Sequence, residues 1–284
     1  MDRRPLALAA ALLSTACAGH RPATPAQSAP QAAVTPSVPV SRDPSSLRYT
    51  AGSARYRIEQ NSYVVQDLMG QSTTVDLGTR QLVSAVATEA AGNLTVALTV
   101  DSMEVTGAPP GADASLAAMR GQTFRIVMAP SGLVVSVAAQ DSANVLLRQA
   151  SNGLRDFFPQ LPGVSAAGQA WTDTVSTTSA GEVSVTIRAV RQHNVVGWED
   201  RNGVRVLHVT STSTYSVSGS GETQGQAVEV SGNGHSTRDA FVSAAGAYLG
   251  SVESDSSSIT ATVTAMGMTI PIRQSRRTTV SRLQ

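Results

Sequence analysis

Apolar and polar residues alternate one by one along much of this chain. Residues 94–101 place leucine and valine on one face and threonine, alanine and aspartate on the other, and residues 183–189 and 259–265 repeat the pattern. A period of two is typical of β-strands that bury one face. Threonine, serine and valine dominate these segments and suit a half-buried pleated surface. The pattern therefore predicts an all-β domain over residues 49–284.

Two turn signals join predicted strands into hairpins. Residues 124–128 and 133–137 alternate on either side of a turn at residues 130–132, which contains proline and glycine. Asn202-Gly203 lies between two further alternating runs and is a strong signal for a tight two-residue turn. Antiparallel neighbours are therefore expected.

One segment, residues 141–158, departs from the alternation and spaces its apolar residues at helical intervals. Asp141 or Ser142 can cap its start, and Pro159 limits its end. An amphipathic helix needs an apolar surface to cover, and the surrounding strands provide one. The predicted fold is mainly β, a curved antiparallel sheet that forms a half-barrel or barrel-like domain with one central amphipathic helix. The helix would join two halves, residues 49–140 and 169–284.

The concave side of such a sheet, under an apolar helix, can enclose a ligand cavity. The residues that would line or cover this cavity are Leu146, Leu147, Leu154, Phe157 and Phe158. The alternative is that these side chains simply fill the core.

The first sixteen residues have the layout of a secretory signal peptide. Two arginines precede a short apolar run over residues 6–13, and small residues follow over 14–16. The run is too short to span a bilayer as a permanent helix. Cys17, the only cysteine of the chain, comes next.

A leader that ends in small residues directly before a cysteine resembles the bacterial lipoprotein signal. The resemblance implies that Cys17 is lipidated after cleavage, although Ser14 stands where that family usually has leucine. Ala18 follows the cysteine, and the family uses aspartate there for retention in the inner membrane, so the resemblance implies the outer membrane. The alternative is an ordinary signal peptide cut near Ala16.

Residues 17–48 are rich in proline, alanine and serine and contain little large aliphatic surface. Such a segment cannot bury enough apolar area to offset the entropy of ordering. We interpret it as an extended tether that holds the β-domain away from the membrane.

Composition limits the chemistry that the domain can perform. The formal net charge is +1, with 21 basic and 20 acidic residues, which argues against a nucleic-acid partner. Every basic residue is arginine, so lysine Schiff-base chemistry is excluded. His193, His208 and His235 lie in no metal-binding motif, and no nucleophile elbow accompanies His235 and Asp239. We therefore expect no enzymatic activity and no cofactor or metal.

Aromatic residues make up 4% of the chain, and a carbohydrate-binding surface usually needs exposed rings. Trp171 and Trp198 are the candidates, but both are expected to be buried at strand ends.

The sequence also resembles β-rich domains of bacterial lipoproteins, through residues 69–71, 124–132 and 161–171. More remotely it is similar to lipoprotein carriers of the LolA, LolB and LppX type. That resemblance rests on the lipid signal, the many strands and the covering helix. It implies a curved sheet that holds lipid on its concave face. The expected function is a lipid-anchored envelope protein that binds an apolar ligand or lipid. The alternative is a structural or protein-interaction module tethered to the outer membrane.

Overall fold

The computed structural model of the chain describes residues 43–68, 70–107, 119–140, 145–179 and 181–284. Its strands are β1 (Gly52–Leu68), β2 (Gln71–Ala90), β3 (Asn93–Thr106), β4 (Thr123–Met128), β5 (Val134–Ala139), β6 (Ala170–Ser179), β7 (Val183–Arg201), β8 (Val204–Thr223), β9 (Gln226–Ser243), β10 (Tyr248–Val263) and β11 (Met268–Leu283). Its helical elements are α2 (Val145–Gly153) and the short 3₁₀ helices η1 (Leu154–Asp156) and η2 (Thr264–Met266).

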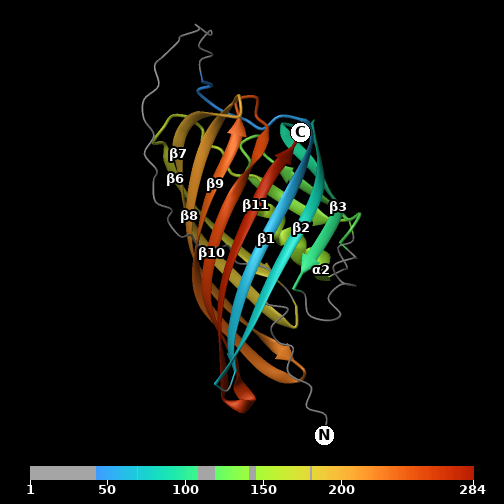
Figure 1. Ribbon diagram of the computed structural model, residues 1–284, viewed down its shortest axis with the longest axis vertical. Coiled ribbons are helices and arrows are strands. Elements are labelled where there is room, and N and C mark those ends of the chain that lie inside the picture. The colour runs from blue at the N-terminus through green and yellow to red at the C-terminus, as the bar shows by residue number, and fades with distance from the viewer. Residues whose placement is uncertain (1–42, 69, 108–118, 141–144, 180) are drawn as a thin grey trace.

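All the strands belong to one antiparallel sheet in the order β5-β4-β3-β2-β1-β11-β10-β9-β8-β7-β6. Each strand pairs with its neighbour in sequence, except that β1 pairs with β11 and β5 does not pair with β6. The sheet curls into a half-barrel that is wide at one end and narrow at the other (Figure 1). The predicted fold class, a curved antiparallel sheet with a helix, is confirmed.

The alternation of apolar residues decides which face of each strand is buried. Leu94, Val96, Leu98 and Val100 of β3 are all at most 4% exposed, as the pattern predicts. Their side chains lie on the inner, concave face, which carries the apolar cores described below. The side chains between them face outward and are less buried.

Both predicted turns form where the sequence places them. Asn202 and Gly203 take φ values of 51° and 78° and connect β7 to β8 in the manner of a two-residue hairpin turn. The β4–β5 turn contains Gly132, whose φ is 86°. A Cβ atom at Gly132 would lie 2.5 Å from the carbonyl oxygen of Pro159, so only glycine permits this close approach.

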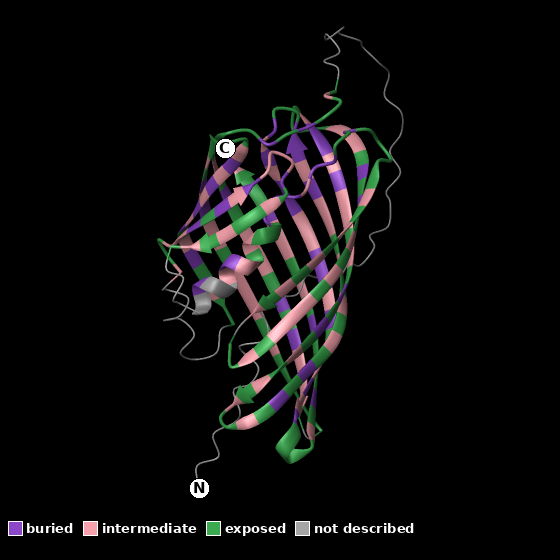
Figure 2. Ribbon diagram, turned by 180° about the vertical axis from the view of Figure 1, so that it is seen from behind, coloured by how far each residue is buried: buried purple, intermediate pink, exposed green. Residues whose placement is uncertain are grey.

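The helix α2 ends earlier than the predicted span of 141–158, and residues 141–144 lie outside the described part. It ends at Gly153, and η1 then leads to Phe157, whose backbone N–H bonds the carbonyl oxygen of Leu154. The prediction extended the helix through Phe157 and Phe158, but α2 stops at Gly153, a residue that weakens helices, and a 3₁₀ turn carries the chain on to Phe157. The helix contacts both β5 and β6 and thereby lies across the open side of the half-barrel (Figure 2).

Two apolar clusters fill the inner face. The wide-end cluster includes residues of β1–β4, β7–β11, the helix, the segment after it and the N-terminal segment. The narrow-end cluster consists of Val64, Tyr215, Val217, Val228, Val230, Ile259, Ala261, Val263, Ile270 and Ile272. The narrow-end cluster consists of strand side chains that bury one another, and the helix α2 packs against the wide-end cluster instead. Polar inner residues of β10, Ser251 to Ser257, lie between the clusters.

The last residues of the predicted tether contact the domain. Leu47 is 5% exposed and belongs to the wide-end cluster, and Asp43 accepts two hydrogen bonds of 2.8 Å from Arg205. Residues 1–42, including Cys17, lie outside the described part. None of the described helices has the length and apolar character needed to cross a membrane.

Candidate functional site

The segment after the helix, residues 154–161, inserts into the wide end of the sheet, and we call it the plug. Phe157 and Phe158 are each 7% exposed. Their rings lie 4.9 Å apart and make edge-to-face contacts with Tyr56 at 5.3 Å, Tyr49 at 5.6 Å and Tyr248 at 5.6 Å. Each such pair adds roughly 0.5–1.5 kcal/mol beyond the burial of apolar area. The plug is therefore part of the core.

Backbone contacts fix the far end of the plug. The hydroxyl group of Tyr49 donates a 2.8 Å hydrogen bond to the carbonyl oxygen of Pro159. The N–H of Leu161 donates to the carbonyl oxygen of Ser131 in the β4–β5 turn at 2.7 Å. Both bonds lie beside the aromatic cluster. Because hydrogen bonds are directional, they fix the position of the plug backbone, which apolar packing alone does not.

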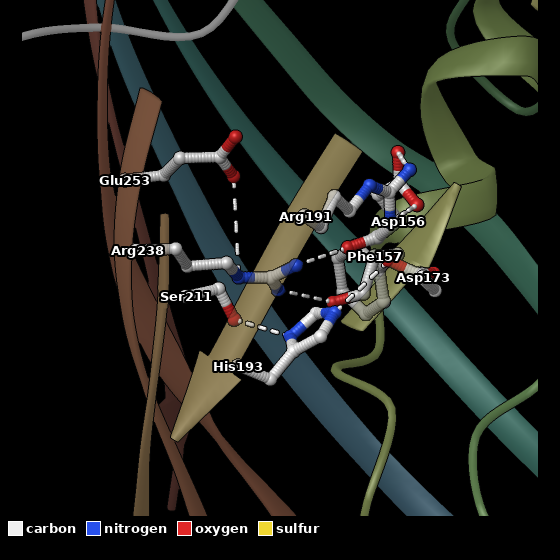
Figure 3. A network of polar contacts seen from close by, with 8 residues as sticks. All are labelled: Asp156, Phe157, Asp173, Arg191, His193, Ser211, Arg238 and Glu253. Carbon is white, nitrogen blue, oxygen red and sulfur yellow. Dashed lines mark hydrogen bonds and ion pairs between the residues drawn. The ribbon is translucent and has the colours of Figure 1, made fainter. Parts of the chain in front are cut away.

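Two arginines of the inner face fix the near end of the plug (Figure 3). Arg191 of β7 donates to both carboxylate oxygens of Asp156, at 2.8 and 2.9 Å. Arg238 of β9 donates to the carbonyl oxygens of Asp156 and Phe157, at 2.5 and 2.8 Å. The planar guanidinium group suits such paired contacts.

Arg238 is charged although it is buried. Burial favours its neutral form, but Tyr248 and the carboxylates of Glu253 and Asp156 outweigh burial and raise the pKa of Arg238 above its ordinary value. Glu253 of β10 lies 3.9 Å from Nε of Arg238, and the Tyr248 hydroxyl accepts a 3.1 Å hydrogen bond. The buried charge is thus compensated by the groups that it positions.

Beside this contact, Asp173, His193 and Ser211 line up across β6, β7 and β8 (Figure 3). Asp173 Oδ1 is 3.2 Å from His193 Nε2, and His193 Nδ1 is 2.7 Å from Ser211 Oγ. Burial lowers the pKa of His193, and the hydrogen bond to Asp173 only partly opposes this shift. A neutral imidazole protonated on Nε2 would donate to Asp173 and accept from Ser211.

The order aspartate, histidine, serine matches the connectivity of a hydrolase triad, but a triad also needs donors for an oxyanion. The backbone around Ser211 is paired with β7 on one side and β9 on the other. The Arg238 guanidinium already contacts the plug. We therefore interpret Asp173, His193 and Ser211 as a polar network that lies under the plug. Sequence reasoning missed it because the three residues come together only through strand register.

The indole ring of Trp171 stacks on His193, with centroids 4.8 Å apart and an interplanar angle of 13°. Trp198 donates from Nε1 to the carbonyl oxygen of Ser165 at 3.1 Å. Both tryptophans are half-buried and pack against the wide-end cluster. Neither provides an exposed ring.

A buried carboxyl group lies between the two clusters. Asp255 of β10 is fully buried and accepts 2.8 Å contacts from the Tyr215 hydroxyl at both oxygens. Burial raises the pKa of Asp255 to about 8, against the opposing effects of Tyr215 and Arg276. Tyr215 reaches it by crossing β9 at Gly234, where a Cβ atom would lie 2.3 Å from the ring.

Four of the five predicted ligand-site residues, Leu147, Leu154, Phe157 and Phe158, contact the wide-end cluster or belong to it. Leu147 is 2% exposed and packs there with Phe157 and Phe158, while Leu154 is half-buried against the cluster. The side chain of Leu146 lies outside the described part, as does Cys17. The placed residues thus come together, but as packed core.

The structure records a shallow, open hollow elsewhere, on the outer face of β1, β2 and β11. It has a volume of about 190 Å³ and is lined by Asn61, Ser62, Tyr63, Asp76, Ser275, Arg276 and Arg277. We call it the outer hollow. Sequence reasoning missed Tyr63, although its position out of step with Tyr56, Ile58 and Val64 assigns it to the outer face.

The other histidines form no shared site. His208 is 2.9 Å from Asp239, while His235 lies 3.3 Å from Ser256. Within the described ranges no three His, Cys, Asp or Glu side chains are arranged to bind a metal ion.

No protein-family model and no curated protein matches this sequence. Among solved structures, a mutant porin of Rh. blastica is 10% identical with a TM-score of 0.23, covering 82% of this chain and 100% of its own. OccK2 of Pseudomonas aeruginosa is 7% identical with a TM-score of 0.25, covering 82% and 98%. A putative outer membrane lipoprotein-sorting protein domain from Vibrio parahaemolyticus is 10% identical with a TM-score of 0.14, covering 80% and 83%. These likenesses are too slight to support an argument about function.

Proposed function

We propose that this chain is a lipid-anchored protein of the cell envelope without enzymatic activity. It is attached to the outer membrane through Cys17, and residues 17–48 hold the domain away from the bilayer. The β-domain over residues 49–284 acts as an interaction module that binds an envelope component on its outer surface.

The observation that carries this proposal is the packing of the plug. Phe157 and Phe158 occupy the place where a ligand between sheet and helix would lie, and each is 7% exposed. The arginines beneath them are already paired with Asp156, Glu253 and backbone carbonyl groups. A filled inner face supports a function on the outer surface.

The support for the anchor is the sequence around Cys17. Two acyl chains attach a protein stably, because each buried methylene contributes about 0.8 kcal/mol. We expect the wild-type chain to fractionate with membranes and to gain the mass of its lipids at Cys17. Cys17→Ser should be found in the soluble fraction, and Ser14→Leu should be processed at least as well as the wild type. Membrane attachment that persists in Cys17→Ser would contradict the anchor.

Native mass spectrometry tests the interaction module directly. The full chain with Cys17→Ser is purified from a bacterial periplasm without detergent and weighed before and after organic extraction. The proposal predicts the mass of the polypeptide alone in both measurements. An extra mass that extracts as lipid would contradict it.

An apolar ligand between sheet and helix is the second candidate, and the position of α2 favours it. The helix contacts both β5 and β6, so it covers the open side of a half-barrel whose inner side chains are apolar. The ligand would then contact Leu146, Leu147, Leu154, Phe157 and Phe158. The extractable mass described above is the result that this candidate predicts.

A further inference from the structure

The outer hollow contains the exposed aromatic ring of this molecule. All four phenylalanines, five tyrosines and two tryptophans lie in the described ranges, and among them Tyr63, at 48% exposed, is the only one in the exposed class. The other ten aromatic rings are buried or half-buried and gain the free energy of removing apolar surface from water, whereas Tyr63 gains less of it. Its position in a recorded hollow suggests a ligand that covers it.

Strand register arranges polar side chains around this ring. Tyr63 of β1 lies opposite Asp76 of β2 on one side and Ser275 of β11 on the other. One row away, Asn61 lies opposite Gly78 and Arg277. These side chains share the outer face, because residues two apart on a strand point to the same side.

Gly78 of β2 lies opposite Asn61, which lines the hollow. A Cβ atom there would lie 2.5 Å from Thr106 Oγ1 and 3.4 Å from Asn61 Oδ1, so the Asn61 amide lies beside a position without a side chain. In Figure 1 this face of β1, β2 and β11 is turned to the viewer, with α2 behind the sheet. The hollow is therefore on the opposite side of the sheet from the plug.

Two charged residues of the hollow, Asp76 and Arg277, differ from their charged neighbours on the outer face. Neighbouring arginines on the outer face form ion pairs, Arg80 with Glu59 at 3.2 Å and Arg273 with Asp67 at 3.2 Å. Asp76 and Arg277 form no hydrogen bond or ion pair with any side chain in the described part of the chain. Strand spacing of about 4.8 Å and a two-residue rise of about 6.8 Å place their Cα atoms roughly 12 Å apart.

On the outer face, one acid, Asp76, and one base, Arg277, lie beside the exposed ring and determine which ligands fit. Arg276 also lines the hollow, but it lies opposite Asp255 in the register and alternates to the inner face. A carboxylate accepts hydrogen bonds from hydroxyl groups, and a guanidinium donates hydrogen bonds to hydroxyl oxygens. An anion would meet Asp76 and a cation would meet Arg277, so neither sign of charge is favoured overall. A ligand with many hydroxyl groups and an apolar ring face satisfies both charges and also covers Tyr63.

We propose that the outer hollow binds a neutral saccharide, with Tyr63 against the sugar ring and Asp76, Arg277 and Asn61 on its hydroxyl groups. The inference rests on the proposed function, because it specifies the chemistry of the envelope component bound there. The two proposals can be distinguished by experiment. If the protein carries no extractable lipid and also binds no sugar, the proposed interaction module stands and the saccharide site is rejected.

The test is binding of the full chain to an array of neutral mono- to tetrasaccharides of hexoses and N-acetylhexosamines. The full chain with Cys17→Ser contains no lysine, so an amine-reactive dye labels it at the α-amino group alone. We expect binding to at least one neutral saccharide, confirmed by titration with that sugar. Tyr63→Thr keeps the preference for a strand and removes the ring, and it should weaken binding by about tenfold. Asp76→Asn and Arg277→Gln should each weaken binding by about tenfold as well.

The control is Val86→Thr, a change at another exposed outer position of β2, which should leave binding unchanged. Thermal unfolding shows whether each variant is folded. Three results would overturn the proposal: no binding to any neutral saccharide, equal binding by wild type and Tyr63→Thr, or binding only to sugar phosphates or to zwitterionic dipeptides printed on the same array.

Discussion

The plug and the outer hollow contain the same kinds of residue in opposite situations. Under the plug, aromatic rings stack on one another, and Arg191 pairs with Asp156 at 2.8 Å. In the outer hollow an aromatic ring is exposed, and Asp76 and Arg277 have no partner in the described part. Groups that satisfy one another contribute to stability, whereas groups left unsatisfied at a surface are available to a ligand. The difference separates the residues that fold this chain from those that we assign to binding.

The largest expected effect is at the plug. Phe157→Ala removes a ring from the aromatic cluster and should lower the free energy of unfolding by about 3–5 kcal/mol. Met266→Ala, a change at a residue 51% exposed in η2, should stay within about 0.5 kcal/mol. Urea unfolding measures both. A loss at Phe157 no larger than that at Met266 would show that the plug is not part of the core.

Comparing substitutions of Tyr56 and Tyr63, both on β1, separates the effect of burial on stability from the effect of strand preference. Tyr56 is 3% exposed on the inner face and Tyr63 is 48% exposed on the outer face. Tyr56→Thr should cost about 3 kcal/mol and Tyr63→Thr about 0.5 kcal/mol or less, because threonine retains the preference for a strand. Chemical denaturation gives the two values. Equal losses of stability for the two variants would show that the inner and outer faces do not differ in burial at these positions.

Asp255 adds a dependence on pH to the inner face. Its pKa of about 8 exceeds the ordinary value, so between about pH 4 and pH 8 the folded state binds a proton that the unfolded state releases. Stability from this group is therefore greatest at the acidic end and falls toward pH 8, by at most about 1.4 kcal/mol per pH unit. Asp255→Asn should flatten this decline in urea unfolding series at pH 5 to 8. Parallel curves for the two proteins would show that Asp255 is ionised in the fold.

The ion pair at the edge of the plug should give the smallest effect on the inner side. Asp156→Asn removes the charge that pairs with Arg191, and because Asp156 is 51% exposed the loss should be about 1 kcal/mol. The loss should shrink further at high salt, as expected for a screened pair. Asp200→Asn, at a residue 71% exposed, should cost less. Unfolding at two salt concentrations measures the difference, and a loss independent of salt would argue for packing instead of charge.

The fold was readable from the sequence because its signals are local. Alternation along residues 94–101 and the turn at Asn202-Gly203 each need only a few neighbouring residues. The pairing of β1 with β11 is not local, since Tyr63 lies opposite Ser275, and it determines both the half-barrel and the outer hollow. The line of Asp173, His193 and Ser211 likewise depends on the register of three strands. The helix was predicted, but the predicted end at residue 158 was too late, because the apolar periodicity continues past Gly153, where α2 gives way to a 3₁₀ turn.

Amide hydrogen exchange of the plug tests the central claim most directly. The full chain with Cys17→Ser is measured by mass spectrometry alone and with palmitate as an apolar probe. The account predicts slow exchange for peptides covering residues 154–161, as in the core strands, with no change when palmitate is added. Faster exchange in these peptides on adding palmitate would show that the plug yields its place to a ligand, and the inner face would then be the functional site.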